Sequence, residues 1–276
     1  MLNITDTTHV LCYGQPTGAF TVAGQGGVGP YTYSFNGGIT FTNTVQYTNL
    51  PANMVGAGYC VIVRDANGCL ATACVNINEP AQLQGLADSI IMVSCFGGAD
   101  GIIAVHGVGG VAPYAYSFNG GAAMTTRIFD GLTAGNYSIV ITDANGCAYT
   151  MNTIIITQPA ILVLNIDTTY NPTCTGVCDG VIEVSSTGGT AGYEYSLDGI
   201  AYQATGIFPG LCNGSYTVYT RDAQGCIKTR QITILQPAPM NANAAVTSFF
   251  PASPALIQFN VPCFGDCTGT ATSTPN

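Results

Sequence analysis

Residues 132–147 of the chain read Leu-Thr-Ala-Gly-Asn-Tyr-Ser-Ile-Val-Ile-Thr-Asp-Ala-Asn-Gly-Cys. Tyr137, Ile139 and Ile141 occupy every second position, which is the side-chain period of a half-buried β-strand. The segment Asp143-Ala144-Asn145-Gly146 follows at once, and a cluster of Asp, Asn and Gly after such a run is typical of a tight turn. The stretch therefore predicts a β-hairpin.

The same hairpin recurs along the chain. Asp65-Ala66-Asn67-Gly68-Cys69 stands 78 residues earlier, and Asp222-Ala223-Gln224-Gly225-Cys226 stands 79 residues later. A fixed spacing predicts an array of similar structural units. We therefore divide the chain into repeat 1 (1–80), repeat 2 (81–159), repeat 3 (160–237) and a remainder (238–276) that reads as a linker and the start of a truncated repeat 4.

The composition indicates that the repeats are β structure. The chain has only three Glu and one Lys, too few to line the solvent faces of helices. Short β-branched and aromatic runs, separated by Gly, Asn and Asp, indicate small Greek-key sandwiches. Pro80, Pro159 and Pro237 restrict the backbone at the junctions. We expect an all-β fold, a rod-like array of tandem immunoglobulin-like or fibronectin-like β-sandwich repeats of about 79 residues.

The charge of the chain excludes several partners. Lys and Arg number 5 against 14 Asp and Glu, a net charge of −9, whereas phosphate binding needs clustered Lys and Arg. We therefore expect no nucleic acid partner. No apolar run approaches the ~20 residues that span a bilayer, so we expect no membrane insertion. Residues 1–6 lack the basic start and apolar stretch of a signal peptide, which predicts an internal fragment of a longer, exported protein.

The 12 cysteines indicate disulfides and an oxidising, extracellular location. Two positions recur in every complete repeat, an early cysteine and the cysteine after the hairpin. Repeat 2 has only these two, Cys95 and Cys147, so we predict that they pair. By analogy, the other predicted pairs at these positions are Cys12–Cys69 and Cys174–Cys226.

The remaining cysteines also come in pairs. A three-residue turn after Asp65 places Cys60 opposite Cys74 across the hairpin, within disulfide reach. Cys178 and Cys212 remain in repeat 3 and should pair. The remainder carries Cys263 and Cys267, whose partners we expect outside this chain. Zinc is the alternative, but the sequence contains no Cys-x-x-Cys motif.

No catalytic set is apparent in the sequence. His9 and His106 occupy non-equivalent positions, and neither completes a Ser, His and carboxylate set. Glu183, Glu194 and Asp198 crowd repeat 3 and would suit a carboxylate pair, or simply exposed strand and turn positions. We expect that the chain is not an enzyme.

Two recurring residue types have both a structural and a binding interpretation. The hairpin residues Asp65, Asp143 and Asp222 either cap their own turns or bind calcium, although no Asp-x-Asp-x-Asp-Gly loop is present. We expect no cofactor, with calcium as the alternative. The alternating aromatic residues Tyr31-x-Tyr33-x-Phe35, repeated from Tyr114, form either the core face of a strand or a platform that stacks sugars.

A tyrosine follows the motif Leu-x-x-Gly-x in two repeats and a longer version of it in the first. Tyr59, Tyr137 and Tyr216 occupy this place. They resemble the tyrosine corner of immunoglobulin-like folds, in which the hydroxyl bonds back to the preceding turn. The alternative is that they are plain core tyrosines.

Three motifs of repeat 2, in order, resemble one known family. They are Cys-Phe-Gly-Gly-x-Asp-Gly (95–101), Gly-Gly-x-x-Pro-Tyr-x-Tyr-Ser-Phe-x-Gly-Gly (109–121) and Leu-x-x-Gly-x-Tyr-x-x-x-x-x-Asp-Ala-Asn-Gly-Cys (132–147), closed by Gln-Pro. The combination resembles the SprB-type repeat of gliding-motility adhesins and related surface proteins of Bacteroidota. Repeat 3 departs from it, with Gly192 in place of Pro and no Phe-Gly after Cys174.

The resemblance implies a cell-surface filament exported by type IX secretion, although the sorting domain expected in the family is absent. It also gives a meaning to Asp6-Thr7-Thr8, Asp88-Ser89-Ile90 and Asp167-Thr168-Thr169, which match the O-glycosylation signal of these bacteria at Thr7, Ser89 and Thr168. A turn at a strand edge is the alternative explanation of this recurrence.

The sequence thus predicts a structural stalk or adhesin repeat that mediates or presents adhesion, in gliding motility or surface attachment. Its expected partners are neighbouring repeats of the same chain, polysaccharide and abiotic surfaces. The alternatives are an array of carbohydrate-binding modules, in which exposed Tyr and Asn hold the carbohydrate, and a subunit of a self-assembling extracellular filament.

Overall fold

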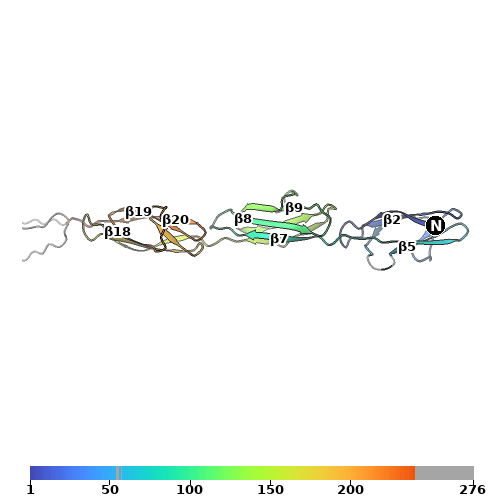
Figure 1. Ribbon diagram of the computed structural model, residues 1–276, viewed down its shortest axis with the longest axis horizontal. Helices are drawn as coiled ribbons and strands as arrows, with labels where there is room; N and C mark the ends of the chain where they lie inside the picture. Colours follow the sequence, from blue (N-terminus) through green and yellow to red (C-terminus); the bar gives the residue numbers. More distant parts are fainter. Residues whose placement is uncertain (54–55, 57, 240–276) are drawn as a thin grey trace, which may run out of the picture. The chain divides into compact units, whose positions relative to one another are not determined.

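The computed structural model describes residues 1–53, 56 and 58–239. The regular secondary structure of these residues is β-strand (Figure 1). None of them forms a helix that could cross a membrane. The prediction of an all-β chain of tandem β-sandwich repeats is confirmed. The predicted start of a repeat 4, with Cys263 and Cys267, lies outside the described residues apart from Ala238 and Pro239.

Repeat 1 forms two three-stranded antiparallel sheets. Its strands are β1 (Leu2–Thr8), β2 (Gly18–Gly24), β3 (Thr32–Ser34), β4 (Gln46–Leu50), β5 (Tyr59–Arg64) and β6 (Leu70–Val75). One sheet has the order β1-β2-β4 and the other the order β3-β5-β6. The hairpin that the sequence predicts after Arg64 joins β5 to β6, and Cys60 pairs in register with Cys74 across it.

Repeat 3 has the same topology. Its strands are β15 (Val163–Tyr170), β16 (Gly180–Thr187), β17 (Glu194–Ser196), β18 (Ile207–Leu211), β19 (Gly214–Arg221) and β20 (Ile227–Ile234). The sheet orders are β15-β16-β18 and β17-β19-β20. The equivalence of the strand orders shows that the sequence period is also a structural period.

Repeat 2 differs in that the long strands of its hairpin are each divided. Its strands are β7 (Gln84–Ile91), β8 (Gly101–Val108), β9 (Ala115–Phe118), β10 (Ile128–Leu132), β11 (Gly135–Tyr137), β12 (Ile139–Thr142), β13 (Ala148–Thr150) and β14 (Ile154–Ile156). The first sheet has the order β10-β8-β7, whereas β9, β12 and β13 form the second and β11 pairs with β14. At the division, the backbone N–H of Met151 donates to the carbonyl of Ile139.

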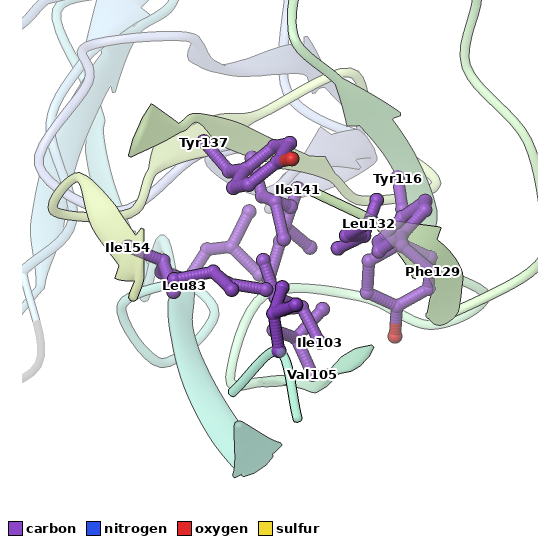
Figure 2. Packing of buried hydrophobic residues seen from close by; sticks show 12 residues of the cluster. Leu83, Ile103, Val105, Tyr116, Phe129, Leu132, Tyr137, Ile141 and Ile154 are labelled. Atoms are coloured by element: carbon purple, nitrogen blue, oxygen red, sulfur yellow. The ribbon is translucent and has the colours of Figure 1, made fainter. Parts of the chain in front are cut away.

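Each repeat has its own hydrophobic core. In repeat 2, Ile103 and Val105 of β8 face Ile139 and Ile141 of β12, and all four are fully buried. Figure 2 shows Ile103, Val105 and Ile141 together within this cluster. Every second residue of β8 is buried, because a strand in a sandwich turns alternate side chains toward the facing sheet. Separate clusters fill repeat 1 and repeat 3.

By compactness, the described chain divides into two units. The first unit combines Met1–Val93 with Ala99–Thr157, and the second combines Ser94–Gly98 with the chain from Gln158 onward. The short turn Ser94–Gly98, which the sequence assigns to repeat 2, is therefore grouped with repeat 3. The domain boundaries at 80/81, 159/160 and 237/238 stay a prediction.

Candidate functional site

The turn of each hairpin is built around its aspartate. In repeat 2, Oδ1 of Asp143 accepts hydrogen bonds from the backbone N–H groups of Asn145 and Cys147, each at 2.9 Å. Its Oδ2 accepts from the N–H of Val111, also at 2.9 Å. Asp143 is 5% exposed. Both carboxylate oxygens are thus engaged by backbone donors, which is the turn-capping role.

The other two hairpins repeat this geometry. Asp65 accepts from Asn67, Cys69 and Val28, at 3.0, 2.8 and 3.1 Å respectively. Asp222 accepts from Gln224, Cys226 and Thr190, at 3.0, 2.8 and 2.8 Å respectively. Among the described residues, no group of three or more His, Cys, Asp and Glu side chains is placed to hold a metal ion.

The hairpin aspartate also requires glycine in the loop that it holds. Gly110 has a φ of +57°, and a Cβ there would lie 2.6 Å from Oδ2 of Asp143. Gly189 has the same φ, and its Cβ would lie 2.5 Å from Oδ2 of Asp222. A glycine pair follows β2, β8 and β16. The close approach of the aspartate carboxylate and the left-handed backbone together explain why glycine stands there.

Hydrogen bonds lower the pKa of two turn aspartates, the half-buried Asp65 and the exposed Asp198. The backbone N–H of Val28, followed by that of Cys69, lowers the pKa of Asp65 below its ordinary value. The hydroxyl of Ser196, followed by the N–H of Ile200, lowers the pKa of Asp198 to about 2. Both carboxyl groups therefore stay ionised at neutral pH as acceptors for their own turns. Neither provides a proton donor for acid catalysis.

The recurring cysteines do not pair within their own repeats. Cys12 is bonded to Cys147, with an S–S distance of 2.00 Å and a Cα–Cα distance of 5.6 Å. Cys95 is bonded to Cys226, with corresponding distances of 2.02 and 5.7 Å. The early cysteine of one repeat thus bonds the hairpin cysteine of the next. The predictions of Cys12–Cys69, Cys95–Cys147 and Cys174–Cys226 are wrong.

Strand length explains the error. In repeat 2, Cys95 precedes β8, whereas the hairpin turn contacts Val111, which follows β8. The eight residues of β8 separate these two ends by about 25 Å. A disulfide needs Cα atoms within about 7 Å, so the two recurring cysteines of one repeat cannot meet.

The other two predicted disulfides are present. Cys60 is bonded to Cys74 within the hairpin of repeat 1, and Cys178 is bonded to Cys212 within repeat 3. Cys174 is also disulfide-bonded. Cys69 is exposed and is the one free cysteine among the described residues.

Further contacts surround the Cys12–Cys147 bond. The side-chain amide of Asn145 donates to the carbonyl oxygen of Leu11 at 2.8 Å, and Sγ of Cys147 lies 3.4 Å from the same oxygen. Val111, Asn145, Pro80 and the segment 7–11 line a shallow hollow at this place. At the second bond, Sγ of Cys226 lies 3.5 Å from the carbonyl oxygen of Ser94.

The residue before the junction proline holds the turn of the early cysteine. Oε2 of Glu79 accepts from the N–H of Gly14 at 2.6 Å, and Oε1 of Gln158 accepts from the N–H of Gly97 at 2.7 Å. The sequence interpretation missed both residues and Asn145. The recurring Glu or Gln before each junction proline was the available signal.

The three corner tyrosines do bond back to the preceding turn. Their hydroxyls donate to backbone carbonyls, that of Tyr137 to Thr133 at 2.7 Å, that of Tyr216 to Cys212 at 3.0 Å and that of Tyr59 to Pro51 at 3.0 Å. This is the tyrosine-corner arrangement.

Replacing Tyr137 by phenylalanine should lower the free energy of unfolding by about 1 kcal/mol, because the hydrogen bond to Thr133 is lost while the buried ring remains. Urea unfolding measures the change. Tyr149→Phe removes a hydroxyl elsewhere in repeat 2 and is the matched control. Equal effects of the two substitutions would contradict the corner role.

The other candidate residues do not form a catalytic site. Nδ1 of His9 accepts from the N–H of Asn78 at 3.1 Å, whereas His106 pairs with Asp88 at 2.6 Å. Arg127 pairs with the second oxygen of Asp88. This exposed trio is a feature that the sequence interpretation did not identify.

The crowded carboxylates of repeat 3 have separate partners. Glu194 pairs with Arg221, Asp198 accepts from the hydroxyl of Ser196, and Glu183 lies opposite Thr168 in the sheet. Of the aromatic alternation, Tyr33 and Tyr116 are buried in the core, which matches the core interpretation.

The three candidate glycosylation residues lie on the first strand of each repeat. Ser89 on β7 is exposed, and Thr7 on β1 and Thr168 on β15 are half-buried. A register shift between Ala87 and Ser89 interrupts the pairing of β7 with β8. The pairing also shifts between Ile166 and Thr168 in β15, and between Ile4 and Asp6 in β1. Each candidate residue thus follows a β-bulge, a local geometry that a structural role would also explain.

Comparison with solved structures gives distant likenesses to arrays of immunoglobulin-like domains. The three N-terminal domains of the Highly Immunogenic Outer Capsid protein (Hoc) of bacteriophage RB49 match with 13% identity and a TM-score of 0.42, over 86% of this chain and 99% of that chain. The N-terminal eight Ig domains of Down Syndrome Cell Adhesion Molecule match with 12% identity and a TM-score of 0.33, over 85% and 42% respectively.

No curated protein matches the chain. The family model of the SprB repeat matches residues 4–40, 93–123 and 166–201. Each match begins on the first strand of a repeat or just before its early cysteine, and ends after β3, β9 or β17. One match falls in each of the three repeats defined by the hairpin spacing. The chain thus carries one region similar to the SprB repeat in each of its three repeats, which is consistent with a SprB-type repeat region.

Proposed function

We propose that the chain is a load-bearing stalk of a surface adhesin, in which two covalent routes cross each junction between repeats. The observation that carries the proposal is the Cys12–Cys147 bond, which joins the same two repeats as the backbone linker Glu79-Pro80-Ala81. The Cys95–Cys226 bond repeats the arrangement one period later. Disulfides persist in oxidising compartments, which supports an extracellular location.

The overlap of the two disulfides supports this mechanical role. Cys95 lies inside the loop that Cys12–Cys147 closes, and Cys147 lies inside the loop that Cys95–Cys226 closes. Repeat 2 is thus bonded both to repeat 1 before it and to repeat 3 after it along the sequence. A cut or a stretch of one linker leaves the neighbouring repeats joined through sulfur.

The finer parts of the proposal depend on the family resemblance. They are presentation of adhesion in gliding motility or surface attachment, export by type IX secretion, contact with polysaccharide or abiotic surfaces, assembly into a filament, and O-glycans on Thr7, Ser89 and Thr168. No cofactor and no enzymatic step belong to this proposal. The burial of Tyr33 and Tyr116 gives no support to a sugar-stacking platform on that strand.

Cutting one linker tests the proposal. A specific protease site inserted after Pro80 in the full chain allows the backbone to be cut between repeat 1 and repeat 2. We expect the cut protein to migrate as one species without reductant and as two fragments with it. The same insertion in the Cys12→Ser/Cys147→Ser variant is the control, and it should separate without reductant. Separation of the cut parent chain without reductant would overturn the proposal.

A further inference from the structure

We propose that the hairpin end of repeat 1 is a docking site for the early-cysteine turn of a further SprB repeat, and that Cys69 bonds the cysteine of that turn. The inference rests on the proposed function and extends it, because it assigns the partner of a surface that the described chain leaves open. Cys69 is free and exposed, although its equivalents in repeats 2 and 3 are both bonded.

The hairpin of repeat 1 already has the geometry of the two bonded hairpins. Asp65 holds the N–H of Cys69 at 2.8 Å, against 2.9 Å for Asp143 and Cys147. Gly68 has a φ of +84°, against +82° for Gly146. The turn therefore needs no rearrangement to present its cysteine as the bonded hairpins do.

The surface beside Cys69 also matches its equivalents. Asn67 is exposed, and its equivalent Asn145 donates to the carbonyl of Leu11 in the docked turn. Val28 is 49% exposed, and its equivalent Val111 lines the hollow beside that turn. A thiol, an amide donor and an apolar side chain thus stand where the hairpin of repeat 2 meets its partner.

The two docked turns define the chemistry of the partner. They read Val10-Leu11-Cys12-Tyr13-Gly14 and Val93-Ser94-Cys95-Phe96-Gly97, with the valine 3% exposed and the glycine at a φ of +72° or +75°. A partner with this turn offers one thiol and the backbone carbonyl of the residue before it. In both observed bonds, the early cysteine belongs to the repeat that comes first in the sequence. A further SprB repeat placed ahead of repeat 1 provides the thiol and the carbonyl in this order.

The bond forms by oxidation of two thiols. Cys69 and the partner cysteine together lose two electrons and two protons to a low-molecular-weight disulfide such as oxidised glutathione, which is reduced to two thiols. The exchange proceeds through a mixed disulfide that the second thiolate attacks. Cys69 is accessible to both reagents because it is exposed.

A longer chain tests the inference. Residues 81–162 are duplicated ahead of Met1, which then stands in the place of Val163. Leu2, Asn3 and Ile4 of the chain thereby take the places that Leu164, Asn165 and Ile166 have after the original. The chain is oxidised with a glutathione mixture, its free thiols are alkylated, and its peptides are mapped without reduction. We expect the copy of Cys95 bonded to Cys69 in a monomer, and the copy of Cys147 alkylated.

The same chain with Cys69→Ser is the control, and it should leave the copy of Cys95 alkylated. A bond between the copies of Cys95 and Cys147, with Cys69 alkylated, would overturn the inference. A covalent dimer through Cys69 would overturn it as well, because the partner would then be a second chain. If the same map contains the Cys12–Cys147 bond, either failure leaves the proposed function intact. If the map lacks the Cys12–Cys147 bond, both the inference and the proposed function are overturned.

Discussion

Serine in place of both Cys12 and Cys147 will lower the free energy of unfolding by about 5 kcal/mol, the largest effect that we expect from any disulfide in the described chain. The bond closes a loop of 135 residues, and the entropy that a cross-link removes from the unfolded chain rises with the length of the loop. Chemical denaturation of the oxidised protein measures the change.

The Cys60→Ser/Cys74→Ser variant is the matched control, because that bond closes a loop of only 14 residues and should contribute about 3 kcal/mol. A larger loss in the control than in the Cys12 and Cys147 variant would contradict the prediction. Cys147→Ser alone adds a qualitative check. It should make Cys12 reactive toward an alkylating agent while Cys95 stays bonded, whereas pairing within repeats would release Cys95.

Alanine in place of Asp143 will lower the free energy of unfolding by about 3 kcal/mol. The substitution removes an ionised acceptor from the N–H groups of Val111, Asn145 and Cys147, at a site that is nearly closed to solvent. Hydrogen bonds to charged groups contribute about 1.5–3 kcal/mol each, and their sum is not fully additive. Urea unfolding measures the loss.

Two comparisons make the Asp143 prediction specific. Asp65→Ala removes the same three bonds at a half-buried turn, and it should cost less. Calcium and a chelator should leave the unfolding midpoint of the parent protein unchanged, because the carboxylate oxygens are engaged by the backbone. A midpoint that falls when the chelator is added would instead support the calcium interpretation.

Local sequence patterns predicted the features that depend on neighbouring residues. The alternation around Ile139 and Ile141 gave a core strand, and both side chains are fully buried. The three-residue turn after Asp65 fixed which residues face each other, so Cys60–Cys74 followed from counting. For Cys60–Cys74 the decisive contacts lie within one hairpin, where the backbone leaves a single register.

The Asp88, His106 and Arg127 trio shows a different limit. These residues come from β7, from β8 and from the segment just before β10, and they meet only because the three strands are neighbours in one sheet. Neither residue spacing nor composition brings them together. The strand order had to be known first.

By itself, the sequence determined the period of the array, its all-β class, the recurring hairpin and the disulfides closed within one hairpin or one repeat. It could not determine the partners of Cys12 and Cys95, because two cysteine positions that recur in every repeat fit pairing within a repeat and pairing between repeats equally well. The tertiary structure decided between them. A strand of seven or eight residues holds the two cysteines of one repeat at opposite ends of its sandwich, and only the next repeat brings a hairpin cysteine within bonding distance.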